Sequence, residues 1–477
     1  GAHEHNIAFG NITGQKITSG SYNFLGGYGA GRCITTGSRN IFIGCKAAYC
    51  DTITGDYNNM FGSAAGQQIT SGGRNNGMGN GVLEDLTEGL CNVAIGAQAG
   101  HKVTTGDNNT LFGAYAGCLL ADGGHNIFIG ASAGRNSANA GGSIIIGKSA
   151  GNTGVCICDN IIIGNEAGYA GAMTGKYNTI MGMQAGCDIA AGQYNTILGH
   201  CAGSNLTSGD DNVTIGHGAN QTGVTTGDDN VFVGNYAGDN NSSGACNVFI
   251  GHHAGKLHTT GNCNVAIGHC ADYKNCTGRG NVMLGSCAGK CNDDRNNNVF
   301  IGPSAGKYAY DGDENFFGGY NAGANSSGTG NVFLGSRSNA GAVLGERTCN
   351  TFVGYQSGEQ TKTGDKNIFL GAKAGNTNDT GCCNVAIGYD VELPSTTGNS
   401  QFAIGAGTDR WLTGDSNYVV SSGNALEAGT FFQNAINLDT NTTFPASGTK
   451  NGGVFGPYTI DSGVTLTISS GSTFTII

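Results

Sequence analysis

Four histidines recur at regular spacing in the middle of the chain: His200, His217, His252 and His269. Each one directly follows a glycine that ends a short apolar triplet, and Asn235 takes the same place between the second and the third. In a stacked chain these imidazoles would form one column, and imidazole nitrogen is a common ligand of transition metals. We favour a row of surface imidazoles, exposed or hydrogen-bonded to one another. The alternative is a metal ion held where the columns of three chains meet.

Three acidic pairs are the best candidates for catalysis: Asp210–Asp211, Asp228–Asp229 and Asp293–Asp294. Paired carboxylates carry out glycoside hydrolysis, but these pairs lie in predicted turns, where Asp is favoured for structural reasons. The spacing lacks the GGxGxDxUx pattern of calcium-binding β-rolls, and no GxxxxGK[ST] phosphate loop occurs. We therefore expect no enzyme and no cofactor, apart from the alternative of a metal ion in the histidine column.

The chain has 18 cysteines, which are scattered over different positions instead of being set at metal-knuckle spacing. Two pairs would be neighbours in a stack, Cys246 with Cys263 and Cys270 with Cys287. Rungs of a β-stack lie about 4.8 Å apart, within the Cα separation that a disulfide tolerates. We favour small buried thiols, with disulfides between neighbouring rungs as the alternative.

A repeat of about 17 residues must position all of these side chains. Each copy has an Asn, an apolar triplet and a stop glycine, then a small-residue corner, a Thr-rich segment and a polar turn, as in residues 92–108. Triplets of β-branched and aromatic residues between Asn and Gly predict strands and not helices. We expect a second short strand in the Thr-rich segment, as at Val103–Gly106.

The predicted fold is all-β, a β-solenoid of about two dozen coils in which residues 1–405 form the shaft. After Gly405 the repeat ends, and apolar and polar residues alternate from Val464 to Ile468, which predicts a half-buried strand. An open solenoid edge needs a cap. Residues 406–477 are therefore expected to form a β-rich cap or tip.

The asparagine before each triplet has a predicted role of its own. In a stack of equivalent rungs, Asn side chains can hydrogen-bond from one rung to the next as a ladder; a turn-tolerant polar residue is the alternative. The predicted ladder includes Asn92, Asn109, Asn126, Asn160, Asn247 and Asn264.

The strand triplets also predict an interface. Alternation sends the first and third residues to one face and the middle residue to the other, and we expect the first and third to fill the coil. The middle residue would then face outward, and it is often apolar, which favours side-by-side association, most simply as a homotrimer. The predicted interface residues are Phe42, Phe128, Ile145, Ile162, Phe232, Phe249, Phe300, Phe333 and Phe369.

Composition excludes several classes of partner. The net charge is −11, and nucleic-acid binding needs clustered Lys and Arg. No apolar run approaches the roughly 20 residues that span a bilayer. Gly makes up 88 of 477 residues without a Gly-X-Y period, which excludes collagen, and only 12% of residues are charged, which argues against disorder. We expect neither nucleic acid nor a membrane span.

The repeat resembles that of tail fibres of marine bacteriophages, cyanophage-like ones in particular. The similarity is carried by the NVAIGxxAG...TTGxxN copies, by GAGTDRWLTGDS after the last copy, and by the terminus PYTIDSGVTLTISSGSTFTII. The repeat is also similar to the head of trimeric autotransporter adhesins. This resemblance implies a homotrimeric fibre of the virion that contacts other virion proteins and binds a host-surface glycan or protein receptor. The alternative is a bacterial extracellular filament or cell-surface adhesin built from solenoid subunits joined end to end.

Overall fold

The computed structural model describes residues 5–50, 52–154, 157–341 and 345–417, together with the backbone of five short strands after them. The chain divides into two units, Gly1–Asn298 and Val299–Ile477. Each unit is a β structure in its own right, and the described residues contain no helix.

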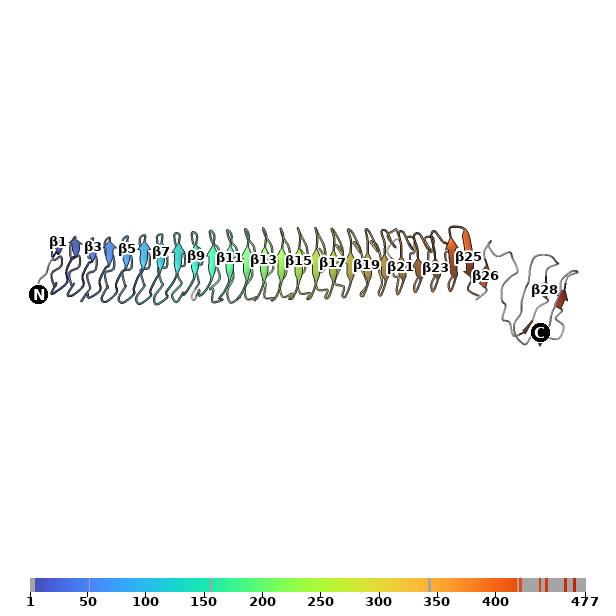
Figure 1. Ribbon diagram of the computed structural model, residues 1–477, viewed down its shortest axis with the longest axis horizontal. Helices are drawn as coiled ribbons and strands as arrows, with labels where there is room; N and C mark the ends of the chain where they lie inside the picture. Colours follow the sequence, from blue (N-terminus) through green and yellow to red (C-terminus); the bar gives the residue numbers. More distant parts are fainter. Residues whose placement is uncertain are drawn as a thin grey trace. The chain divides into compact units, whose positions relative to one another are not determined.

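The first unit is a stack of seventeen three-residue strands in which each strand pairs in parallel with the next (Figure 1). Each residue pairs with its counterpart one repeat later, for example Val93 with Thr110 and Ala94 with Leu111. The strands are β1 (Ile7–Phe9), β2 (Phe24–Gly26), β3 (Ile41–Ile43), β4 (Asn59–Phe61), β5 (Asn76–Met78), β6 (Val93–Ile95), β7 (Thr110–Phe112), β8 (Ile127–Ile129), β9 (Ile144–Ile146), β10 (Ile161–Ile163), β11 (Thr179–Met181), β12 (Thr196–Leu198), β13 (Val213–Ile215), β14 (Val231–Val233), β15 (Val248–Ile250), β16 (Val265–Ile267) and β17 (Val282–Leu284).

The second unit continues the repeat and then changes direction. Its parallel strands are β18 (Val299–Ile301), β19 (Phe316–Gly318), β20 (Val332–Leu334), β21 (Thr351–Val353), β22 (Ile368–Leu370), β23 (Val385–Ile387) and β24 (Phe402–Ala406). β25 (Asp409–Gly414) then pairs antiparallel with β24, and β26 (Val420–Ser422) pairs antiparallel with β25. β27 (Asn437–Leu438) pairs with β29 (Thr459–Ile460), and β28 (Thr442–Phe444) pairs with β30 (Leu466–Ile468). The role of residues 406–477 as a cap or tip stays a prediction.

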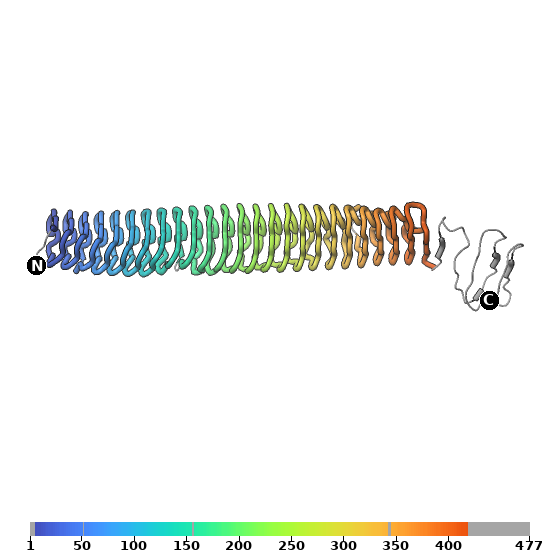
Figure 2. The backbone as a smooth tube through the Cα atoms, in the orientation of Figure 1, coloured from blue at the N-terminus to red at the C-terminus, as the bar shows by residue number. Residues whose placement is uncertain are grey.

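The predicted β-solenoid with coils of about 17 residues is confirmed, and Figure 2 shows the successive coils as a smooth tube. The predicted second strand is wrong: Val103–Gly106 is not a strand. Its backbone still bonds to the next rung, as from Thr104 N–H to the Ala121 carbonyl at 3.0 Å. In the described Thr-rich segments only isolated bridges form, such as Ile34 with Ile53, because Gly and turn residues interrupt the extended chain every few positions.

The stop glycine of each copy is required by the corner that it makes. Gly96 has φ +135°, a conformation that L side chains rarely adopt, and a Cβ there would lie 2.5 Å from the carbonyl of Gly113 in the next rung. Any side chain would therefore push neighbouring coils apart, which explains why the triplet always ends on Gly.

The prediction that the middle strand residue faces outward is wrong. From β2 to β24 this residue is buried inside the coil. The nine residues predicted to form an interface are completely buried: Phe42, Phe128, Ile145, Ile162, Phe232, Phe249, Phe300, Phe333 and Phe369. The physical reason is that successive side chains point to opposite faces of a strand, and the asparagine before the triplet points inward. Asn92 is buried, so Val93 points outward, Ala94 points inward and Ile95 points outward again.

Two columns of side chains fill the coils. The middle strand residues form the first core column, in which the rings of Phe300, Phe317, Phe333, Phe352 and Phe369 stack with centroids 4.6 to 4.9 Å apart. The second core column comes from the Thr-rich segments across the coil. Its aliphatic residues in the first unit include Ile69, Leu86, Val103, Leu120, Ile189 and Leu206, and its polar residues include Ser137, Thr225, Asn241, His258, Asn275 and Asn292.

Candidate functional site

The buried asparagines form a continuous ladder along the coils. The Asn109 amide donates to Asn92 Oδ1 at 2.9 Å and to the Gly123 carbonyl at 2.9 Å, while Asn109 Oδ1 accepts from the backbone and side chain of Asn126. Equivalent bonds join the other predicted members to their neighbours: Asn92 to Asn75, Asn160 to Asn178, Asn247 to Asn230 and Asn264 to Asn247. Each Asn therefore ties one rung to the next and also closes its own coil.

A serine continues this ladder where Asn is absent. The backbone N–H of Ser143 donates to Asn126 Oδ1, its hydroxyl donates to the Ile157 carbonyl at 2.9 Å, and Ser143 Oγ accepts from Asn160 N–H at 3.2 Å. A hydroxyl can both donate and accept, so it performs the two tasks of the amide at this rung.

The outward side of the strands is a largely apolar surface, which we call the outer sheet face. It consists of the first and third residues of each strand triplet. No charged residue occupies either position in β1–β17, and several of these side chains are well exposed, such as Phe112 at 53% and Ile129 at 37%. A strand that is apolar on both faces is normally covered on both faces.

The size of the outer sheet face in the first unit can be estimated from strand geometry. Seventeen strands about 4.8 Å apart, each three residues long at about 3.3 Å per residue, give a face of roughly 750 Å². Monomeric proteins rarely expose contiguous apolar patches larger than a few hundred Å², whereas a typical protein interface covers about 800 Å² on each partner. The face thus has the extent of an interface.

The four predicted histidines form two stacked pairs on the surface. The ring centroids of His200 and His217 lie 5.2 Å apart, and so do those of His252 and His269, with nearly parallel planes in both pairs. Tyr236 continues the contact from His217, where its ring lies edge-on at 5.2 Å. Among the described residues no three His, Cys, Asp or Glu side chains are grouped so that they could hold a metal ion.

Two other histidines, His253 and His258, have lowered pKa values. Partial burial lowers the pKa of His253, which lies beside His252, and the neighbouring His252, Lys256 and His269 lower it further. Full burial lowers the pKa of His258 in the second core column to about 4, so this ring is neutral and its Nε2 lies 3.0 Å from the Asn264 amide.

The cysteines of the described residues are free thiols. Cys246 and Cys263 are exposed, occupy equivalent positions in consecutive coils and are not joined. Burial is the main cause that raises the pKa of the Cys270 and Cys201 thiols. These thiols are therefore protonated at neutral pH and poorly nucleophilic.

Aspartates of the acidic pairs accept hydrogen bonds from the backbone of turns. Asp210 Oδ1 accepts from the backbone N–H of Gln193 at 2.7 Å, and Asp294 Oδ1 accepts from the backbone N–H of Thr277 at 2.7 Å. In each case a carboxylate of one coil ties down the polar turn of the preceding coil. This is the structural role that Asp commonly has in turns.

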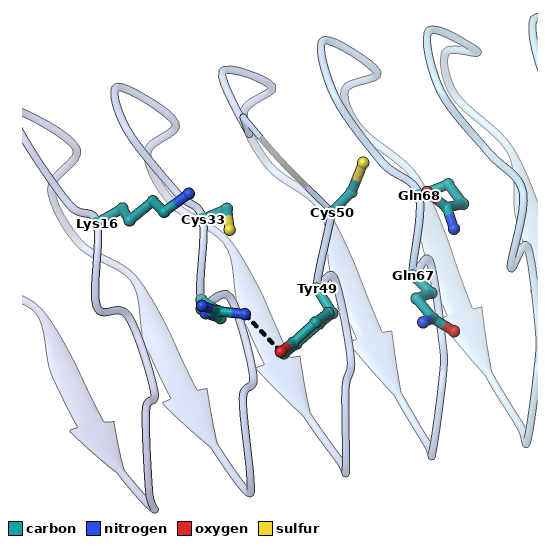
Figure 3. Close-up of a pocket in the computed structure, with 7 residues that line it drawn as sticks. Lys16, Cys33, Tyr49, Cys50, Gln67 and Gln68 are labelled. Atoms are coloured by element: carbon teal, nitrogen blue, oxygen red, sulfur yellow. Dashed lines mark hydrogen bonds between the residues drawn. The ribbon is translucent and has the colours of Figure 1, made fainter.

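One cleft lies on the corners that follow β1–β4, in the first unit. Its volume is about 250 Å³, and it is lined by Lys16, Arg32, Cys33, Tyr49, Cys50, Gln67 and Gln68. Figure 3 shows that these side chains come from four successive coils. Arg32 Nη1 donates to the Tyr49 hydroxyl at 2.5 Å, and its guanidinium carbon lies 5.1 Å from the centre of the same ring.

Comparison with known proteins adds no relative. The chain matches no family model, no curated protein and no solved structure. The described part of the chain also contains no helix with the length and hydropathy of a membrane crossing.

Sequence reasoning missed both the outer sheet face and the cleft. The first could have been found from the repeat itself, because a buried Asn ladder fixes which strand residues share its inward side. The cleft gave no such signal, since its seven residues belong to four different copies and only stacking brings them together.

Proposed function

We propose that this chain is a structural fibre protein. Copies associate side by side through the outer sheet face, most simply as a homotrimer, and form a rigid spacer that attaches a virus particle to a host cell. Several weak contacts on one fibre add through effective concentration, so attachment does not require one tight site.

The outer sheet face is the observation that carries this proposal. It is long, largely apolar and free of charged residues along β1–β17, while the chain as a whole is acidic. An identical copy is the partner that best fits, because a neighbouring chain would present the same apolar strip at the same rung spacing. The roughly 750 Å² estimated for the first unit is comparable with the area that each partner of a stable complex buries.

The regularity of the coils supports a role as a spacer. Each rung is bonded to the next through its strand, its ladder Asn and its corner backbone, as between β6 and β7. The resemblance of the repeat to tail fibres of marine bacteriophages supports the attachment role. A bacterial filament or adhesin made of subunits joined end to end is the alternative, and the mass of the chain in solution distinguishes the two.

The test is the mass of the intact chain in solution, together with two variants. We expect the wild type to have three times the monomer mass of 48.2 kDa. The double variant Ile95→Lys/Ile129→Lys places two charges on the outer sheet face and should be monomeric. Thr105→Lys, an exposed change in the Thr-rich segment, should stay trimeric.

Circular dichroism should show the same β content in all three proteins, because neither variant alters a buried residue. A monomeric wild type, or a trimer that tolerates both lysines, would contradict the proposed assembly. Polymers that grow without limit as concentration rises would favour the filament.

A further inference from the structure

We infer that the cleft at Lys16 and Arg32 binds a negatively charged sugar unit, one bearing a carboxylate or a sulfate ester, of a surface polysaccharide. This inference deepens the proposed function and rests on it, because an attachment fibre needs a ligand on the cell that it meets.

The lining of the cleft has the chemistry of an anion site. Lys16 and Arg32 are cationic, Gln67 and Gln68 supply amide donors, and none of the described residues that line the cleft carries a carboxylate. This contrasts with the whole chain, whose net charge is −11. Up to Asn75 the sequence has five Lys and Arg against three Asp and Glu, so this part of the chain is not acidic.

Arg32 is held in place and retains an unused donor. Its Nη1 is bonded to the Tyr49 hydroxyl, and the Tyr49 ring packs over Gly29, where an added Cβ would lie 2.7 Å from the ring. Arg32 Nε is covered and has no hydrogen-bond partner among the described residues. An anion beside the exposed part of the guanidinium would form charge-assisted hydrogen bonds, which are the strong ones.

The two carboxylates on the next corner are already engaged. Glu84 and Asp85 lie on the next corner after Gln67 and Gln68, where the Gln68 N–H donates to the Glu84 carbonyl. The Glu84 carboxylate lies 3.4 Å from His101, and the Asp85 carboxylate lies 2.7 Å from Lys102. These side chains therefore do not neutralise Lys16 and Arg32.

The size of the cleft limits the ligand. At about 250 Å³ it is smaller than the roughly 300–1,000 Å³ of sites for drug-sized molecules, so it fits one sugar unit of a polymer and not a folded partner. The lining side chains follow one another along four successive coils (Figure 3), so a polymer lying along the coils places one of its units in the cleft.

Calorimetric titration of the intact chain tests the inference with three polymers: polygalacturonate, dextran sulfate and neutral dextran. We expect at least one anionic polymer to bind and neutral dextran not to bind; which one binds distinguishes a carboxylate from a sulfate ester. Affinity should fall as salt rises, because the site is partly exposed.

Two variants and a matched control locate the site. Arg32→Gln should weaken binding at least tenfold, and Lys16→Gln should weaken it about threefold, since Lys16 is a flexible point charge. Arg39→Gln should leave affinity unchanged: Arg39 also bonds a tyrosine, Tyr57 at 2.8 Å, but does not line the cleft.

Equal binding of neutral dextran, no binding of either anionic polymer, or equal effects of Arg32→Gln and Arg39→Gln would overturn the inference. The mass of each protein is measured in the same samples. If the chain is trimeric but binds no polymer, only the assignment of the cleft is wrong. If the chain is monomeric but binds polymer, only the proposed trimeric fibre is wrong.

Discussion

The coils around β6–β12 and those around β13–β17 have the same backbone but different interiors. In the first group the second core column is mainly aliphatic, as at Val103 and Leu120, whereas in the second it is polar, as at Asn241 and His258. Both groups keep the parallel register, the ladder of Asn and the stop glycine. The repeat therefore depends on its inter-rung hydrogen bonds and corners more than on one kind of core residue.

Short-range hydrogen bonds satisfy part of the polar interior, although Asn292 makes none with the described residues through its side chain. Asn275 donates to Asp272 at 3.0 Å and accepts from the Gly278 N–H at 2.8 Å, and Thr225 donates to Asn220 at 2.8 Å. A buried polar group that is bonded costs little, whereas an unbonded one costs a few kcal/mol. In the neighbouring first core column, Phe232 and Phe249 supply large apolar surface beside these polar groups.

The largest expected effect comes from removing such a ring. Phe249→Ala should destabilise its coil by about 3–5 kcal/mol, and Leu111→Ala in the aliphatic group by about 2–4 kcal/mol. The Phe249 ring contacts both Phe232 and His258, so its loss opens a cavity beside a polar residue. Amide hydrogen exchange of the surrounding strands measures the local cost. If the exposed control Thr260→Ala lowers the stability of these coils as much as Phe249→Ala does, the ring is not what stabilises them.

An intermediate effect is expected in the ladder. Asn109→Ala should cost about 2–3 kcal/mol, because it leaves the buried N–H of Asn126 without an acceptor. Asn264→Ala should cost more, since it also removes the partner of His258 Nε2. Asn109→Ser should recover much of the loss, as Ser143 does naturally. Equal losses for Asn109→Ser and Asn109→Ala in thermal unfolding would show that the hydroxyl does not replace the amide.

A pH dependence of stability is expected only in the polar group of coils. Full burial raises the pKa of Asp272 from 3.8 to about 7. The folded state therefore keeps this proton while the unfolded chain releases it, so the contribution of Asp272 to stability is greatest below about pH 4 and falls as pH rises to about 7.

Asp272→Asn should remove this fall, and the exposed change Asp293→Asn should not. Denaturant unfolding at pH 4, 5.5 and 7 measures the effect. An unchanged pH profile in Asp272→Asn would mean that Asp272 is ionised in the folded coil.

Much of the fold was predictable because the repeat is local. The triplets predicted the strands, the glycines predicted the corners, and the asparagines before the triplets are bonded from rung to rung as a ladder requires. The candidate sites were predicted less well. The histidines do stack in pairs, but the residues assigned to the interface are core residues, and the cleft was not foreseen.

The sequence alone determined the length of the coil, the position of each strand and the residues that share a face, because a period of two and a fixed repeat are properties of the chain itself. It did not determine which of the two faces is inside. The expectation from the sequence was that Val93 and Ile95 fill the coil. Tertiary structure decided otherwise: the amide of Asn92 reaches its partners, Asn75 and the Gly106 carbonyl, from inside the coil, and alternation then carries Ala94 inward.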